Sequence, residues 1–481
     1  MDNNSQCLNI LRDTKGKVSN KQLKFYLVNK KQDGYIIDAA LLADHLEDAG
    51  FRTLNLYGNF LIVKVENNIV EVYPPQEVFN YVLDQIKSED NNKLRSDFIN
   101  QGERHLMKNK ALLGSLKSLE LKPYKDDIST SQHFYNNCIA KVTAEGIETI
   151  SYSEFSKSER YILKEKIINR PFEINKKIVS DFESFLKLAT NSLGHFESVC
   201  NCIGYLLCGY KNPANAKAII ISDLLSQATN EANGRSGKGL IIKAIGELIN
   251  VVEYNGKNLD LKKDKFVYQS IDFLTALFVI QDISKSFDFE DLFSQITDKM
   301  DIQRKHAQKI ILDFSDSPKI AITANYTIPQ NTDSFSDRKH MVILNNYFNA
   351  NNKPEREFKK LFFVQWNEKE FLAFDNFMMR CVQSFLKNGL TDYDDPELRK
   401  QNLINNTSKH FVELMESKYS LLNEYYLLKG LADELEINTS EPSVKSRIAM
   451  QWITTFANDK NLKIDKRQSA GIVKFCLAKK L

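Results

Sequence analysis

The stretch Ala232-Asn233-Gly234-Arg235-Ser236-Gly237-Lys238-Gly239 decides the fold class of this 481-residue chain. The apolar run 216–223 precedes it and predicts a β-strand, and helical periodicity over 240–249 follows it. A glycine-bearing loop between a strand and a helix N-terminus points backbone N–H groups at an anion, and its lysine reaches terminal phosphates. The pattern predicts a phosphate-binding loop, with nucleotide contacts from Gly234, Arg235, Ser236, Gly237, Lys238 and Gly239.

This loop departs from the usual pattern at both of its ends. Ala232 stands where a glycine is usual, and Gly239 stands where a Ser or Thr hydroxyl normally binds Mg²⁺. A glycine-rich turn before an ordinary helix is therefore an alternative interpretation of the stretch taken alone. Features further along the chain have to decide between the two interpretations.

Two later apolar segments end in polar side chains that suit nucleotide chemistry. The run 273–282 is typical of a buried strand and ends at Asp282, and the run 319–325 ends at Asn325. Near-continuous apolar runs favour a parallel sheet covered on both faces, and such sheets bind ligands at the carboxyl ends of their strands. An acid there can serve the metal or the attacking water, and an amide can reach the γ-phosphate. Arg338, just before the next apolar strand, is a candidate arginine finger that acts across a subunit boundary.

The order and spacing of these features resemble those of superfamily 3 helicases, specifically the helicase half of poxvirus-type and phage primase–helicases. The resemblance covers roughly residues 168–390, and its segment 289–306 is similar to the family's lead-in to a DNA-contacting loop. It implies a P-loop, AAA+-like three-layer α/β ATPase core with a mostly parallel sheet. It also implies ATP and Mg²⁺ as cofactors, single-stranded DNA as partner, and a ring-shaped homo-oligomer, by resemblance a hexamer.

The same resemblance implies a role for each candidate residue. Lys238 would contact phosphate, Asp282 would serve the metal or the water, and Asn325 would act as sensor. Arg338 would be the finger that acts in trans. The residues that would touch nucleic acid in the central channel of the ring are Arg304, Lys305 and Lys309.

Two departures from the family pattern fall on the magnesium site. Gly239 lacks the hydroxyl ligand, and Gln281 stands first in the usual pair of acids that closes the second strand. Asp282 can take either acidic role, and Asp223 or Asp288 can assist it. We expect active hydrolysis because the sensor amide and the candidate finger are both retained. An ATP-binding chain that hydrolyses ATP slowly is the alternative.

Composition predicts a folded chain of two to four domains, with 42% hydrophobic and 26% charged residues. The net charge of +3 is too mild to indicate nucleic-acid binding, so DNA contacts must come from local basic patches. The chain has no apolar run of about 18 residues and no signal-peptide pattern at its start, so we expect no membrane partner and a location in the cytoplasm of a host cell. The seven scattered cysteines suit reduced thiols, and Cys200, Cys202 and Cys208, near His195, are typical of a buried helix rather than a zinc site.

The rest of the chain is expected to form further domains around the core. The predicted ranges are an N-terminal α+β region at 1–110, a helical collar at 111–210, the ATPase core at 211–390 and a winged-helix-like domain at 400–481. Within them we expect a hairpin that turns at Asn67–Asn68, and amphipathic helices at 358–366 and 374–382. Lysines from Lys15 to Lys31 form either a solvated face or a DNA-docking patch.

The last predicted domain combines helices with a two-stranded wing. A helix is expected at 443–452 after Pro442, and a hairpin is expected across 468–471. Lys445 and Arg447 are then candidates for DNA contact. A protein-binding module fits the same pattern.

These patterns predict an ATP-dependent, ring-forming DNA helicase that acts in the replication of a virus, phage or mobile element. The first hundred or so residues contain no paired acidic motif typical of a primase, so a separate primase is the expected partner. An ATP-binding initiator or loader, in which a weak magnesium site makes the nucleotide a structural switch, is the second hypothesis. A scaffold without nucleotide is the third.

Overall fold

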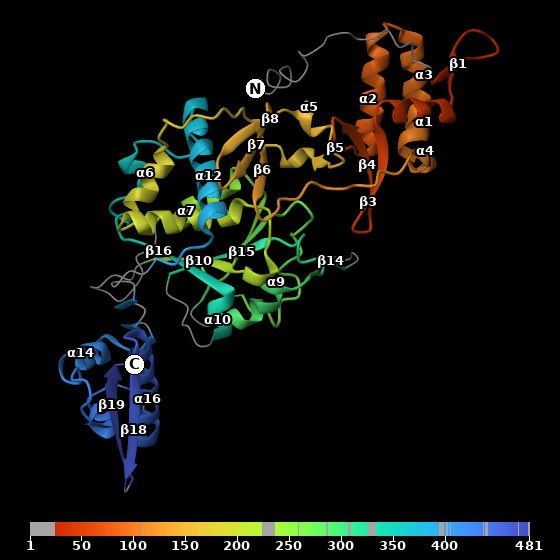
Figure 1. The fold of residues 1–481 in the computed structure, drawn as a ribbon. Helices are drawn as coiled ribbons and strands as arrows, with labels where there is room; N and C mark the ends of the chain where they lie inside the picture. The colour runs from red at the N-terminus through yellow and green to blue at the C-terminus, as the bar shows by residue number, and fades with distance from the viewer. Residues whose placement is uncertain are drawn as a thin grey trace. The chain divides into compact units, whose positions relative to one another are not determined.

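The structure is a computed structural model of the chain. It describes residues 25–108, 110–223, 236–257, 259–284, 287–305, 309–325, 333–393, 399–400, 403–404, 406–435, 437, 441–469 and 471–479. The chain divides into two compact units (Figure 1). The first comprises Met1–Tyr124 with Tyr152–Glu165, and the second comprises Lys125–Ser151 with Lys166–Leu481.

The first unit contains a four-stranded sheet. Its strands, in spatial order, are β3 (Phe51–Leu56), β4 (Asn59–Glu66), β5 (Ile69–Val72) and β9 (Ile162–Leu163). The first three run antiparallel, and β9 joins β5 in parallel. Asn67 and Asn68 form the turn between β4 and β5 with φ of 50° and 63°, the left-handed conformation that a tight hairpin requires. The predicted hairpin is therefore confirmed.

Helices pack with this sheet around one apolar cluster, which includes Phe51, Val82 and Phe98. Asp38 caps the first helix, because its carboxylate accepts hydrogen bonds from the backbone N–H groups of two first-turn residues. The remaining elements of the unit are β1 (Tyr26–Val28), β2 (Tyr35–Ile37), α1 (Ala39–Asp48), α2 (Pro75–Ser88), α3 (Asn92–Glu103), η2 (Arg104–Lys108), α4 (Lys110–Ser115) and α5 (Tyr152–Phe155), and η3 (Lys164–Lys166) crosses its boundary with the second unit.

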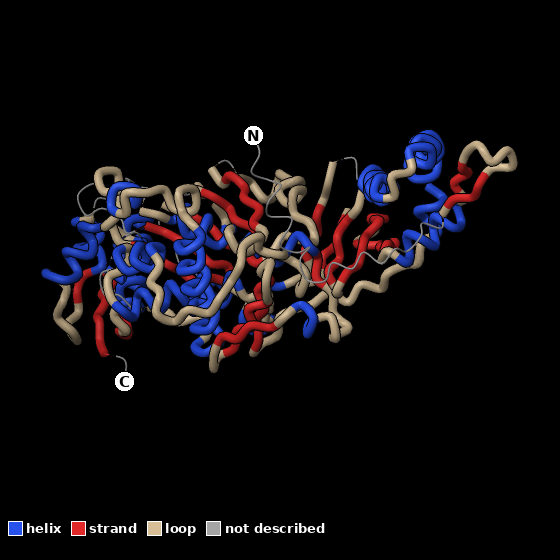
Figure 2. The backbone as a smooth tube through the Cα atoms, turned by 90° about the horizontal axis from the view of Figure 1, so that it is seen from above, coloured by secondary structure: helices blue, strands red, loops and turns tan. Residues whose placement is uncertain are grey.

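A five-stranded sheet forms the centre of the second unit, and all of its neighbouring strands run parallel. Ile219 and Ile221 of one central strand join the apolar cluster on one face, while Ile220 joins the cluster on the other. Both faces are therefore covered, as the near-continuous apolar runs predict, and the unit is mixed α/β (Figure 2). The spatial order is β11 (Val251–Asn255), β12 (Leu277–Gln281), β15 (Lys319–Ala324), β10 (Ala218–Asp223) and β16 (Lys339–Leu344).

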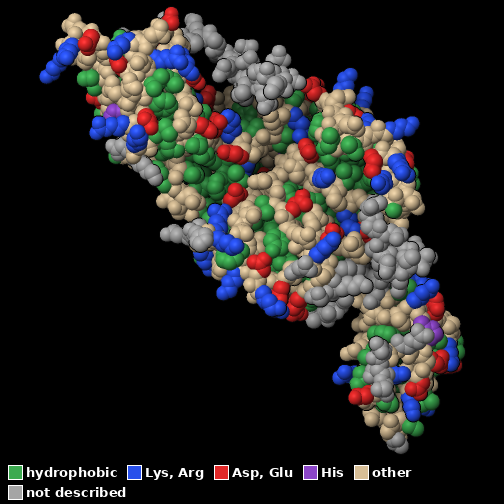
Figure 3. Space-filling view, turned by 180° about the vertical axis from the view of Figure 1, so that it is seen from behind, with side chains coloured by type: hydrophobic (Ala, Val, Ile, Leu, Met, Phe, Trp, Pro, Cys, Tyr) green, Lys and Arg blue, Asp and Glu red, His purple; other side chains and the backbone are tan. Residues whose placement is uncertain are grey.

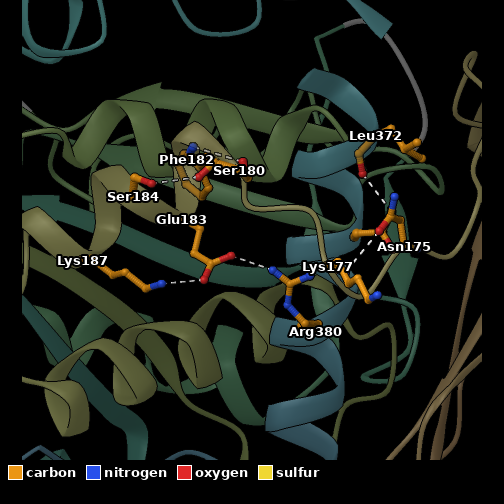
Figure 4. A network of polar contacts seen from close by, with 10 residues as sticks. Asn175, Lys177, Ser180, Phe182, Glu183, Ser184, Lys187, Leu372 and Arg380 are labelled. Atoms are coloured by element: carbon orange, nitrogen blue, oxygen red, sulfur yellow. Dashed lines mark hydrogen bonds and ion pairs between the residues drawn. The ribbon is translucent and has the colours of Figure 1, made fainter. Parts of the chain in front are cut away.

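Helices α6 (Asp181–Leu188), α7 (Leu193–Leu207) and α12 (Glu368–Asn388) belong to the cluster on one face of this sheet. Figure 4 shows Glu183 of α6 accepting hydrogen bonds from Lys187 at 2.7 Å and from Arg380 of α12 at 2.6 Å. The cysteines of α7 are buried, so their assignment to a buried helix is confirmed.

The other face is covered by α9 (Phe293–Thr297) and by the antiparallel pair β13 (Met300–Ile302) and β14 (Ile310–Leu312). Phe289, Met300 and Leu312 are buried there against strand residues. The shorter elements of the unit are η4 (Pro213–Asn215), α8 (Lys238–Gly246), η5 (Phe289–Leu292), α10 (Asp333–Arg338) and α11 (Pro354–Glu357).

Two helical predictions are wrong. The range 111–210 is not purely helical, because β6 (Thr130–Phe134), β7 (Ile139–Thr143) and β8 (Ile147–Ile150) form an antiparallel sheet whose tight turns permit strand pairing. No helix spans 358–366, because Lys359 and Phe363 have φ of 55° and 66°, and such left-handed residues interrupt an α-helix. The helix expected at 374–382 is confirmed as part of α12.

The C-terminal segment of the chain forms a small module with its own core, which includes Phe411, Ile453 and Phe475. Its elements are α14 (Lys409–Ser417), β17 (Tyr426–Leu427), α15 (Leu428–Glu434), α16 (Pro442–Asp459), β18 (Leu462–Ser469) and β19 (Ile472–Lys479). The three strands are antiparallel in the order β17-β19-β18. The helix expected at 443–452 and the hairpin expected across 468–471 are both confirmed. Over the ranges described, no helix combines the length and apolarity that crossing a membrane requires.

Lys319, the first residue of β15, is buried, and its side chain links the sheet to the C-terminal end of α7 through hydrogen bonds. Its ammonium donates hydrogen bonds to the backbone carbonyl oxygens of Tyr205 and Cys208. Carbonyl groups at a helix C-terminus have no partner inside the helix, so a lysine there satisfies them. Burial disfavours the charged form and lowers the pKa of Lys319 from 10.5 to about 8.

We expect Lys319 to make the stability of the protein depend on pH in the alkaline range. Its folded pKa lies below its unfolded value, so the unfolded chain binds more protons between about pH 8 and 10.5. The contribution of Lys319 is therefore complete above pH 10.5 and is lost as the pH falls through about 8. Urea unfolding of wild type and Lys319→Met across this range measures the difference, with exposed Lys369→Met as control. Parallel pH profiles for wild type and Lys319→Met would contradict this assignment.

Candidate functional site

The order of the strands marks the carboxyl ends of β10 and β15, here called the crevice, as a candidate ligand site. From β10 the chain continues to β11, beyond β15 and β12, whereas from β15 it continues to β16, on the opposite side of β10. Connections that leave neighbouring strands in opposite directions define the topological switch point, where open α/β sheets bind ligands. Ser222 pairs with Ala324, so the next residues, Asp223 and Asn325, lie level with each other at this point.

Lys238 reaches into this crevice from the first turn of α8. It is buried, and its Nζ donates a hydrogen bond to Oδ1 of Asn325 at 2.8 Å. The same ammonium forms an ion pair with the Asp223 carboxylate, which also accepts a hydrogen bond from the Ser236 hydroxyl. The structure thus brings Lys238 and Asn325 together, and their roles with a nucleotide stay predictions.

Asp223 lies at the centre of the crevice, although the sequence indicated only that it could assist a metal site. It is 3% exposed, and both of its carboxylate oxygens have partners within the phosphate-loop segment. The signal available in the sequence was an acid that ends the strand before the loop. The sequence could not predict that Asp223 lies beside Asn325, because this depends on the order of the strands in the sheet.

The glycines of the predicted loop differ in what surrounds them. Gly237 caps α8 with φ of 102°, and a Cβ built there would lie 2.4 Å from Cζ of Phe185. A Cβ built at Gly239 meets no atom within 4 Å. Gly234 and Arg235 lie outside the described residues.

At the end of β12, the side chain of Gln281 links three neighbouring strands. Its Nε2 donates to Glu253 of β11 at 2.9 Å, and its Oε1 accepts from Thr323 of β15 at 2.7 Å. Thr323 Oγ1 in turn accepts the backbone N–H of Asp282 at 2.9 Å, and Asp282 adopts a φ of 52°. Gln281 therefore has a structural task in the sheet, and the role of Asp282 with metal or water stays a prediction.

Arg338 lies at the amino ends of the strands, whereas Lys238 lies at their carboxyl ends. It precedes β16, whose first residue, Lys339, pairs with Ala218 at the start of β10, whereas Asp223 pairs with Leu344. Five steps of about 3.3 Å along a strand separate the two ends by roughly 17 Å. The guanidinium of Arg338 lies over the ring of Phe293 at 4.8 Å. The structure therefore does not bring Arg338 to the crevice of its own chain.

The predicted nucleic-acid residues of the central core contact the chain itself. Arg304 donates to the carbonyl oxygen of Ile271 at 2.8 Å, and Lys305 Nζ lies 5.6 Å from the centre of the Phe266 ring. Lys309, across the β13–β14 pair, forms an ion pair with Asp301 at 2.6 Å. Of the two candidates on α16, Arg447 is exposed and Lys445 is half-buried. Basic and acidic side chains are interspersed on the face seen in Figure 3.

Comparison with known proteins adds weak structural likenesses. No family model matches the chain, and no curated protein matches it. The apo structure of the NrS-1 C-terminal region has a TM-score of 0.41 at 10% identity, covering 92% of this chain and 99% of that one. An A-form apo structure of the same region has a TM-score of 0.40 at 12% identity, with 91% and 98% covered. A crystal structure of JCV helicase with a bound substituted acetamide has a TM-score of 0.26 at 14% identity, with 50% of this chain and 65% of that chain covered. At these TM-scores no conclusion about this chain rests on them.

We expect the two loop glycines to respond differently to alanine. Gly237→Ala places a methyl group against Phe185 and a side chain at positive φ, which costs about 1–2 kcal/mol from the backbone alone. Gly239→Ala introduces no contact and is the matched control. Titration with a fluorescent ATP analogue should show weakened binding for Gly237→Ala and nearly unchanged binding for Gly239→Ala. Equal affinities for the two variants would contradict the described loop conformation.

Proposed function

We propose that this protein binds ATP at the crevice between β10 and β15 and works as a ring-forming, P-loop helicase on single-stranded DNA. The observation that carries the proposal is the meeting of Lys238 with Asn325 at the switch point, one from a helix N-terminus and the other from a strand end. A cation and an amide placed there match the needs of a triphosphate, whose charge must be neutralised and whose terminal group must be positioned.

Binding would exchange the partners of Lys238. Its ammonium forms an ion pair with Asp223, and an incoming phosphate would compete for that ammonium. Backbone N–H groups at the N-terminus of α8 have no acceptor within the helix and would supply further donors. Asn325 is then close enough to sense whether the terminal phosphate is present.

The oxygen groups at the crevice fit a magnesium ion. Mg²⁺ binds through one or two carboxylates together with substrate phosphates and water, and Asp223 and Ser236 are such oxygen donors beside Lys238. Asp282, at the end of the strand next to β15, is a further acid at the same edge of the sheet. When bound, the ion would neutralise charge on the phosphates.

The position of Arg338 favours a multi-subunit enzyme. An arginine roughly 17 Å from the crevice of its own chain can stabilise phosphate only in a neighbouring subunit, as in a trans-acting finger. A closed ring, by resemblance a hexamer, repeats this contact at every interface. Movement of the β13–β14 hairpin would then carry Arg304, Lys305 and Lys309 along the DNA, once they exchange their present partners for phosphates.

The C-terminal module supports a second DNA contact. Its order of elements, a helix, a strand, two helices and then a hairpin, is compatible with the proposed winged helix, and α16 carries Lys445 and Arg447. The protein would act in replication of a virus, phage or mobile element, beside a separate primase in the cytoplasm of the host cell. A protein-binding role for this module is the alternative.

A second candidate function is an ATP-binding initiator or loader with little hydrolysis. It is favoured by Gly239, which offers no hydroxyl, and by Gln281, which stands in place of an acid and is held by its neighbours. In such a protein, ATP would stabilise one assembled state rather than drive movement.

Steady-state ATP hydrolysis with Mg²⁺ separates these functions. We expect turnover that single-stranded DNA stimulates, with Lys238→Ala and Arg338→Ala each losing roughly a thousandfold or more, the scale of a lost arginine finger. Lys238→Ala would also weaken ATP binding, whereas Arg338→Ala would leave it intact. Mixing the two inactive variants should restore part of the activity, because some interfaces then combine an intact Lys238 with an intact Arg338. Tight ATP binding by wild type without turnover would favour the initiator.

A further inference from the structure

The crevice lacks both groups from which a phosphate-loop protein usually builds its magnesium site. Position 239 is a glycine with no hydroxyl, and position 281 is a glutamine whose amide is hydrogen-bonded to Glu253 and Thr323. The oxygen donors that contact Lys238 or its immediate partner are instead those of Asp223, Ser236 and Asn325. Among these three, only Asp223 carries a negative charge.

The burial of Asp223 creates a problem of charge balance when phosphate binds. Its carboxylate is 3% exposed, and Lys238 is the cation that the structure places against it. If Lys238 turns to a phosphate, a buried carboxylate remains next to a polyanion, and an uncompensated buried charge is strongly unfavourable. A divalent cation between the carboxylate and the phosphates would compensate both negative groups at once.

We propose that Asp223, assisted by the Ser236 hydroxyl, binds the magnesium ion of the nucleotide and replaces the two missing ligands. The acidic ligand of the magnesium ion would then lie at the end of β10 instead of the end of β12, on the other side of β15, the strand that leads to the proposed sensor Asn325. This proposal rests on the proposed nucleotide site. It accounts for a strand-ending acid that forms contacts with both Ser236 and Lys238.

The geometry also allows a competing role, in which Asp223 only holds Lys238 away from phosphate. The two roles predict opposite effects of Asp223→Asn, a substitution that preserves shape and removes charge. If Asp223 is a metal ligand, Mg²⁺ should raise the nucleotide affinity of Asp223→Asn only slightly. If Asp223 only competes with phosphate for Lys238, Asp223→Asn should bind nucleotide more tightly than wild type, and Mg²⁺ should raise its affinity as much as it does for wild type.

The first experiment measures the affinity of the full chain for a fluorescent ATP analogue, in EDTA and in Mg²⁺. We expect Mg²⁺ to tighten binding to wild type about tenfold or more, and Asp223→Asn to lose most of this gain while retaining its metal-free affinity. Asp84→Asn is the control, because that exposed acid lies in α2 of the first unit and pairs with Lys87 at 2.7 Å. A full Mg²⁺ gain in Asp223→Asn would overturn the proposal. If wild type binds no nucleotide under either condition, the proposed function itself fails.

A second measurement observes the metal directly. Mn²⁺ gives an electron paramagnetic resonance signal that changes on binding, and adenylyl imidodiphosphate prevents turnover. We expect wild type to hold Mn²⁺ only with the nucleotide analogue present, and Asp223→Asn to hold markedly less at equal nucleotide occupancy. Equal Mn²⁺ binding by both proteins would contradict the role of Asp223.

Restoring the usual ligands provides the sharpest test. A Cβ at Gly239 meets no atom within 4 Å, so Gly239→Ser can be accommodated. Combined with Gln281→Asp in the Asp223→Asn background, it should recover most of the lost Mg²⁺ gain and Mn²⁺ signal. Thermal unfolding of each variant checks that the fold survives the loss of the Gln281 hydrogen bonds. A stable triple variant that regains neither the Mg²⁺ gain in affinity nor the Mn²⁺ signal would contradict the proposal that Asp223 takes the place of the usual magnesium ligands.

Discussion

The ion pair between Lys238 and Asp223 is the interaction on which the proposed site depends. It lies where two neighbouring parallel strands send their connections in opposite directions, so the sheet order and not the loop sequence alone determines its position. The pair joins the start of α8 to the end of β10. Any anion that enters has to replace one half of it, which links ligand binding to the conformation of the loop.

Much of this arrangement could be predicted from local patterns. Apolar runs marked the strands that lead to Asp223, Asp282 and Asn325, because a buried parallel strand needs apolar residues on both faces. The importance of Asp223 could not be predicted, because it depends on which strands become neighbours. Long-range contacts likewise decide that Gln281 binds Glu253 and Thr323 rather than a ligand. The sheet within 111–210 was missed because its strands are only four or five residues long, too short for a clear alternating pattern.

The distance between Arg338 and the crevice has a consequence for how the protein would work. Within one chain Lys238 and Arg338 lie at opposite ends of neighbouring strands of the same sheet, so the predicted catalytic groups of one chain do not meet at one site. Assembly would therefore be a condition of turnover and not only of DNA binding. Arg304 and Lys309 contact their own chain, through the carbonyl oxygen of Ile271 and the carboxylate of Asp301, and would have to exchange these partners to bind phosphates as proposed.

The central claim is that Lys238 binds the phosphates of a nucleotide, and equilibrium binding of ATP by calorimetry tests it most directly. Lys238→Met keeps the length of the side chain and removes its charge, and Lys243→Met, on the exposed side of the same helix, is the matched control. We expect wild type and Lys243→Met to bind ATP alike, and Lys238→Met to lose affinity by about tenfold or more. Unchanged affinity in a folded Lys238→Met variant would contradict the account.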